Sequence, residues 1–105
     1  MTEVYEATTA TITVVFTDEN GDSVIPTSAS FVLYDKFSGT VKREGTLDNL
    51  EASMDFELTE GDTAILDQMN KYEILRLEVE FNYNSKVGRG LYEVKIVNLS
   101  YFIPA

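Results

Sequence analysis

The chain has 105 residues, a net charge of −10 at pH 7, and no histidine, cysteine or tryptophan. This length fits one domain, and the lack of cysteine excludes a disulfide framework and thiolate metal sites. The acidic balance argues against nucleic acid as a partner, because affinity for phosphate backbones comes largely from Lys and Arg. No secretory signal pattern is visible, and no apolar run reaches the ~20 residues that span a membrane. We therefore expect a soluble protein without a membrane partner.

The negative charge is unevenly placed along the chain. Residues 1–35 contain six acids (Glu3, Glu6, Asp18, Glu19, Asp22 and Asp35) and no Lys or Arg. Two interpretations remain open: the charge serves solubility, or the N-terminal third faces a basic surface on a partner.

Apolar residues return at every second position in several short runs, which predicts strands with one buried face. Residues 1–9 are weakly patterned and are interpreted as an N-terminal arm or an edge strand, residues 10–99 as the folded domain, and residues 100–105 as an apolar tail. The strands expected within the domain cover residues 9–17, 28–34, 40–44, 53–58, 70–83 and 91–99. Their inward side chains are expected to be Ile12, Val14, Phe16, Ala29, Phe31, Leu33, Met54, Phe56, Leu58, Leu75, Leu77, Val79, Phe81 and Tyr83.

Three departures from simple alternation predict local features. Thr59-Glu60-Gly61-Asp62 has the form of a helix start, and apolar residues at helical spacing follow it. A short helix is therefore expected over residues 60–69. The adjacent Ile74 and Leu75 predict a bulge or a change of face, and residues 84–90 are expected to form a Gly-containing turn.

About seven short strands with regular turns favour a sandwich. A short helix before the penultimate strand, and Tyr72 at the start of that strand, match an immunoglobulin-like pattern. The predicted fold is therefore an all-β, immunoglobulin-like antiparallel β-sandwich with one short helix near residues 60–69.

The chemistry available to the chain is limited to carboxylates, because the usual general bases and zinc ligands are absent. Glu78 and Glu80 share one face of a strand, but the alternating apolar residues direct both to water. Asp18, Asn20 and Asp22 resemble the start of a calcium loop, but Ser23 and Ala29 occupy the positions where that loop needs Gly and Glu. We expect no catalytic residue, no cofactor and no metal site.

Partner contacts are expected at the chain ends and at one basic loop. Lys86 and Arg89 lie in the expected turn, which is either a plain hairpin tip or a contact for an acidic surface on a neighbour. Tyr101, Phe102 and Ile103 either complete an edge of the domain's own core or dock on another subunit. With Tyr5 in the N-terminal arm, these residues form the candidate partner-binding set.

Five stretches in order carry a resemblance to a known family: Ala10–Phe16, Asp18–Asp22, Pro26–Ala29, Leu58–Asp62 and Ile74–Phe81. Together they resemble small immunoglobulin-like virion structural proteins of tailed bacteriophages. The resemblance implies a virion component made in the host bacterial cytoplasm, and it transfers no active-site residue.

The resulting expectation is a non-enzymatic bacteriophage structural protein. It would be a capsid decoration protein, docking on a capsid or connector surface through its termini and strand edges, in many copies or as a homo-oligomer. The alternatives are a neck or tail accessory protein, or a recognition module for a host surface or carbohydrate. A recognition module would cluster exposed aromatics on loops, for which the candidates are Tyr34, Phe37, Tyr92 and Tyr101.

Overall fold

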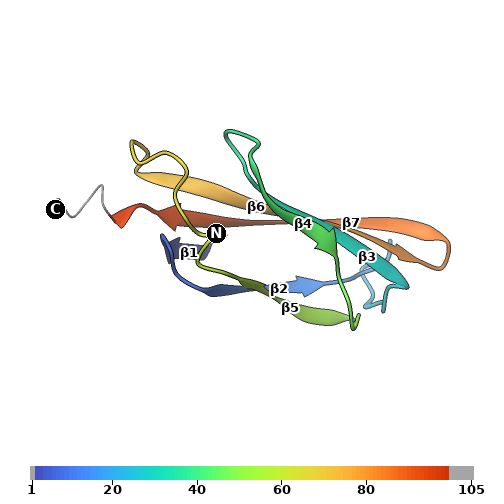
Figure 1. Ribbon diagram of the computed structural model, residues 1–105. Helices are drawn as coiled ribbons and strands as arrows, with labels where there is room; N and C mark the ends of the chain where they lie inside the picture. The colour runs from blue at the N-terminus through green and yellow to red at the C-terminus, as the bar shows by residue number, and fades with distance from the viewer. Residues whose placement is uncertain (1, 100–105) are drawn as a thin grey trace.

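Seven strands form two facing sheets in the computed structural model, which describes residues 2–99 (Figure 1). One sheet has five strands in the order β1-β7-β6-β3-β4, and the other pairs β2 with β5. The expected all-β sandwich is confirmed. The strands are β1 Thr2–Tyr5, β2 Ala10–Val15, β3 Ser28–Asp35, β4 Val41–Thr46, β5 Ser53–Leu58, β6 Tyr72–Tyr83 and β7 Lys86–Val97.

The strand order is that of an immunoglobulin-like sandwich. β7, β6, β3 and β4 correspond to strands G, F, C and C′ of one sheet, and β2 and β5 to strands B and E of the other. Those neighbouring pairs are antiparallel. The expectation of a wholly antiparallel fold is wrong at one edge, however, because β1 runs parallel to β7 with Thr2 opposite Val94.

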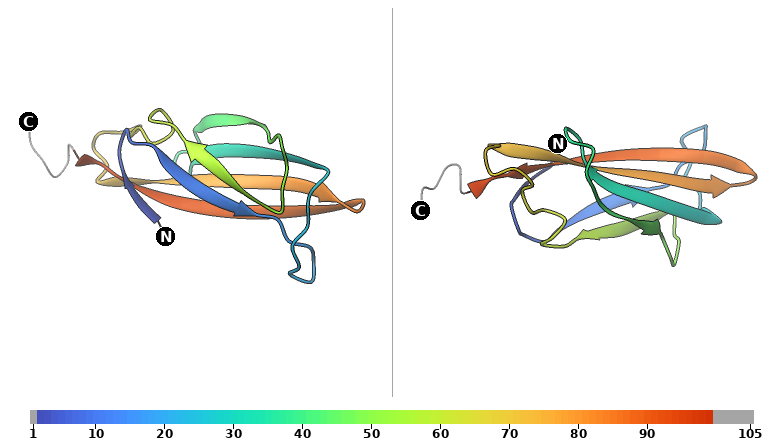
Figure 2. Two further views of the ribbon diagram at one scale, coloured as in Figure 1. Left: turned by 90° about the horizontal axis from the view of Figure 1, so that it is seen from below. Right: turned by 45° about the horizontal axis from the view of Figure 1, so that its top comes forward.

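The core lies between the two sheets (Figure 2) and is built from the alternating apolar residues. Phe16 and Phe81 pack edge to face with ring centroids 4.9 Å apart, as do Phe31 and Phe56. Such pairs add about 0.5–1.5 kcal/mol beyond the burial of their area. Apart from Met54, which is half-buried, every expected core residue is buried.

The expected helix over residues 60–69 is wrong. The helix-start hydrogen bonds do form: the Thr59 N–H donates to Asp62 Oδ2 at 2.8 Å, and the Asp62 N–H donates to Thr59 Oγ1 at 3.3 Å. A continuing helix would need the N–H groups of Leu66 and Asp67 to donate to the carbonyls of residues 62 and 63.

Other parts of the chain form hydrogen bonds with these N–H and carbonyl groups instead. The buried Glu73 carboxylate accepts from the N–H groups of Leu66 and Asp67. The Asp62 carbonyl accepts from Lys42 Nζ, and the Thr63 carbonyl from the Ala7 N–H. The segment consequently forms two successive turns.

The irregularity expected at Ile74 and Leu75 is also absent, since β6 and β7 pair in unbroken register from Tyr72 to Tyr83. Both side chains are buried although they lie on opposite faces of the sheet; Leu75 belongs to the core cluster between the sheets and Ile74 does not. The register shift lies between Leu33 and Tyr34 on the β3–β4 pair. Tyr72 is 42% exposed rather than buried as a tyrosine corner.

The turn expected over residues 84–90 is much shorter. Only Asn84 and Ser85 form it, with φ of 45° and 59°, the conformation of a two-residue hairpin turn. Lys86–Gly90 belongs to β7. Gly88 faces inward, where a Cβ would lie 2.3 Å from Cζ of the Phe81 ring, so the glycine makes room for that ring.

A Gly88→Ala substitution tests this packing. It should displace the Phe81 ring and lower the free energy of unfolding by about 1–3 kcal/mol. Gly90→Ala is the matched control, because its Cβ would lie 3.2 Å from Cε2 of the more exposed Tyr92 side chain. Urea denaturation should show the larger loss for Gly88→Ala; equal losses would contradict the packing argument.

Candidate functional site

The six candidate partner-binding residues do not form one site. Tyr101, Phe102 and Ile103 lie outside the described residues. Tyr5 pairs with Val97 at one end of β7, and Lys86 begins the same strand at its other end. Eleven residues of strand separate them, a distance of roughly 36 Å.

Lys86 is engaged within the chain, at the tip of the β6–β7 hairpin. Its Nζ donates to the Glu19 carboxylate, which also accepts from the Tyr83 hydroxyl at 2.8 Å. Hydrogen bonding from Lys86, with further bonds from backbone and Tyr83, lowers the pKa of Glu19 to about 2. The same contact raises the pKa of Lys86. The expected basic loop therefore joins the hairpin tip to the turn that follows β2.

Arg89 also has an acidic partner in its own chain. Its Nη2 lies 3.5 Å from Glu80 Oε2, across the outer face of the five-stranded sheet, and its side chain is 78% exposed. Glu78 accepts a hydrogen bond from the Tyr34 hydroxyl at 2.9 Å. Both glutamates are exposed, as the alternation predicts.

An exposed patch lies at the opposite end of this face, where Tyr5, Val97 and Tyr72 stand in one row across three strands. Tyr5 is 58% and Tyr72 42% exposed. The next row holds Lys95, whose Nζ lies 4.5 Å from the Tyr72 ring centroid and 3.3 Å from Glu3 Oε1. We call these five residues the terminal patch.

The terminal patch lies near the end of the described chain, since Val97 precedes Leu99 by two residues. Of the terminal patch only Tyr5 is among the candidate residues predicted from the sequence; Glu3, Tyr72, Lys95 and Val97 are not. No alternation pattern could have found them, because the parallel pairing of β1 with β7 sets the row.

The aromatics proposed for a recognition module do not gather. Tyr34 is half-buried and bonded to Glu78, and the Tyr92 hydroxyl crosses between the sheets to bond with the backbone N–H and carbonyl of Val15. Phe37 is 64% exposed in the turn after β3. Tyr101 lies beyond the described part of the chain.

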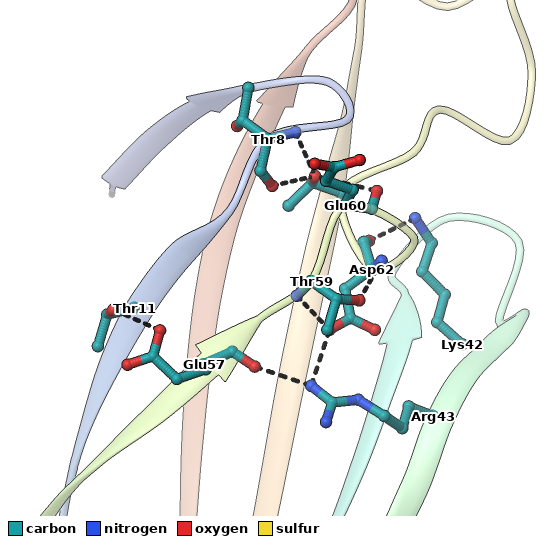
Figure 3. Close-up of polar contacts among 9 residues, drawn as sticks. Thr8, Thr11, Lys42, Arg43, Glu57, Thr59, Glu60 and Asp62 are labelled. Atoms are coloured by element: carbon teal, nitrogen blue, oxygen red, sulfur yellow. Dashed lines mark hydrogen bonds and ion pairs between the residues drawn. The ribbon is translucent and has the colours of Figure 1, made fainter.

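A polar clamp closes the side of the sandwich between β4 and β5 (Figure 3). The Arg43 guanidinium donates to Asp62 Oδ2 at 2.7 Å and to the Glu57 carbonyl at 2.9 Å. It also lies 4.8 Å from the Phe56 ring centroid. Lys42 donates to the carbonyls of Asp62 and Ala64, and burial lowers its pKa. We call Lys42, Arg43 and Asp62 the clamp.

Two further features bear on the site. Among residues 2–99, no group of three or more acidic side chains is placed to hold a metal ion. Within the same residues, no helix is long and apolar enough to cross a membrane.

No protein-family model and no curated protein matches the chain. Two solved structures of mouse leukocyte-associated immunoglobulin-like receptor 1 are similar, both strand-swapped dimers. The immunoglobulin-like domain gives a TM-score of 0.45 at 11% identity, over 90% of this chain and 85% of that one. The extracellular domain gives 0.43 at 11% identity, over 91% and 78%.

The clamp makes a prediction about stability. Arg43→Ala leaves the buried Asp62 carboxylate without its cation and should lower the free energy of unfolding by about 1–3 kcal/mol. Arg89→Ala is the matched control, because it removes an exposed ion pair and should cost about 0.5 kcal/mol or less. Urea denaturation measures both. An Arg43→Ala variant as stable as Arg89→Ala would rule out the clamp as a stabilising contact.

The Glu19–Lys86 contact makes a prediction about pH. Because the pKa of Glu19 is about 2 in the folded chain against 4.5 for the free group, its contribution to stability is complete above pH 4.5. That contribution is lost as the pH falls from 4.5 towards 2. In Lys86→Gln the pKa of Glu19 should rise, so less stability should be lost over this interval.

Carboxyl-carbon NMR titration of Glu19 gives the pKa, and denaturation at several pH values gives the stability. Glu80→Gln is a suitable control, because it alters a different exposed pair on the same hairpin. A Glu19 pKa that stays near 2 in Lys86→Gln would refute the assignment.

Proposed function

We propose that the protein is a non-enzymatic structural protein of a bacteriophage virion, a capsid decoration protein that docks on other virion proteins through its termini and strand edges. The resemblance of five stretches of its sequence to such proteins motivates the proposal. A position in the neck or tail is the alternative within the same function.

The terminal patch is the observation that carries the proposal. It contains two exposed tyrosines and the half-buried Val97, at one end of the sandwich. Tyrosine is enriched at the energetic centres of protein interfaces, since it presents a large rigid surface with a polar end. If many copies bind together to a symmetric lattice, each single contact needs only a low affinity, because simultaneous contacts add avidity.

The test is association with particles. The full-length protein should be present in virions purified from cells that carry its gene cluster, as detected by mass spectrometry. A Tyr5→Ser/Tyr72→Ser double variant should bind such particles about thirtyfold more weakly in co-sedimentation, because each of the two interface tyrosines carries about 1 kcal/mol.

Ile25→Ser is the matched control, because Ile25 is 65% exposed and lies outside the terminal patch. Thermal melts should show that all variants remain folded. Absence of the protein from purified particles would overturn the virion assignment. Equal co-sedimentation of the double variant and the control would overturn docking through the terminal patch.

A further inference from the structure

β7 has a long edge that no strand covers in the described part of the chain. β1 pairs only with Val94–Val97, although β7 begins at Lys86. The Asn98 N–H donates to the Lys71 carbonyl, and the Val97 carbonyl accepts from the Glu6 N–H. The peptide groups of successive β7 residues therefore point alternately towards β6 and towards the β1 side. The peptide groups of Val87, Arg89 and Leu91 therefore point outwards, beyond the part of β7 that β1 covers. We call Val87–Leu91 the free edge.

The edges at β4, β5 and β1 are guarded. On the β4–β5 side, Arg43 points inwards and takes the outward carbonyl of Glu57. β4 also carries the register shift, and bulges and inward charges of this kind discourage strand pairing. β1 is only four residues long. The free edge has no proline, no bulge and no inward charge, so it remains able to accept a strand.

A groove of about 480 Å³ lies beside the free edge, between Thr11–Thr13 of β2 and Leu91–Val94 of β7, with Thr2 of β1 also in its lining. The Phe16 N–H donates to the Ala52 carbonyl, so the even-numbered residues of β2 direct their peptide groups towards β5. The peptide groups of Thr11 and Thr13 therefore point away from β5, towards this groove. The Tyr92 hydroxyl satisfies the outward groups of Val15 at one end. Two unpaired strand edges therefore border one groove.

We propose that the free edge of one copy receives the segment Tyr101–Ile103 of a second copy as an added β-strand. The segment combines aromatic and β-branched residues, which favour strands, and Pro104 would end the pairing because it has no N–H to donate. Main-chain hydrogen bonds would supply affinity, and the groove would receive alternate side chains.

The segment cannot reach the free edge of its own copy. Leu91 lies six residues before Val97, or roughly 20 Å along the strand. Ile103 lies four residues after Leu99, within roughly 14 Å of it. β1 also occupies the edge in between. The contact must therefore join different copies, and a head-to-tail contact of this kind builds rings or filaments.

This inference rests on the proposed function only in that several copies meet; its test needs no particle. Phe102→Asp should disable the donor segment. Leu91→Pro should disable the acceptor, because it removes an outward N–H and leaves the β6–β7 hydrogen bonds intact. Leu91→Lys is a second acceptor variant that keeps the backbone N–H, and Ile25→Lys is the exposed control away from the edge.

Analytical ultracentrifugation over a concentration series should show assembly of the full-length protein and of Ile25→Lys. Each donor or acceptor variant alone should assemble about tenfold more weakly or not at all, as expected for the loss of one or more net hydrogen bonds or apolar contacts. An equimolar mixture of Phe102→Asp and Leu91→Pro should form a 1:1 dimer, because one intact edge and one intact segment remain.

Three results would overturn the inference: a full-length protein that stays monomeric, a mixture that forms no dimer, or assembly lost in the Leu91 variants and kept in Phe102→Asp. The last result would point to pairing between two free edges. Loss of particle binding with normal self-assembly would instead count against the proposed function alone.

Discussion

The buried carboxylates between β5 and β6 hold the sandwich together at one end. Glu73 is 2% and Asp62 4% exposed, and each accepts hydrogen bonds from backbone N–H groups of the connecting segment. An unpaired buried carboxylate would cost several kcal/mol, so these contacts must form together with the fold. Through Arg43 and Lys42 the same segment is tied to β4, and through Thr63 it is tied to Thr8. Hydrogen bonds to β4, to Thr8 and to Glu73 of β6 thus replace the hydrogen bonds of a helix.

Much of the fold could be predicted from periodicity alone. The alternation of Ile12, Val14 and Phe16 identifies β2 and its buried face, and β5 lies at the residues predicted for it. The helix could not be judged in the same way. Its start signal at Thr59 is local and real, but the competing acceptor, Glu73, lies beyond the segment in the sequence.

The glycines near the hairpin show a second limit. Gly88 and Gly90 have the composition of a turn, yet they occupy strand positions that face the rings of Phe81 and Tyr92.

The candidate site shows a third limit of prediction from sequence. Tyr5 could be selected as an apolar residue near a chain end, but its neighbours Tyr72 and Lys95 follow only from the pairing of β1 with β7. Lys86 and Arg89 were selected for their charge, and the acids that engage them come from distant segments or a neighbouring strand.

The parallel arrangement of β1 and β7 has a mechanical consequence. Four residue pairs join the two strands. If a load pulls the chain before β1 and the chain after β7 in opposite directions, the two parallel strands slide past one another. All the hydrogen bonds between them then resist together, whereas an antiparallel pair loaded at one end would open one bond at a time. A subunit anchored through both of its ends would therefore carry the tension across this four-pair seam in shear.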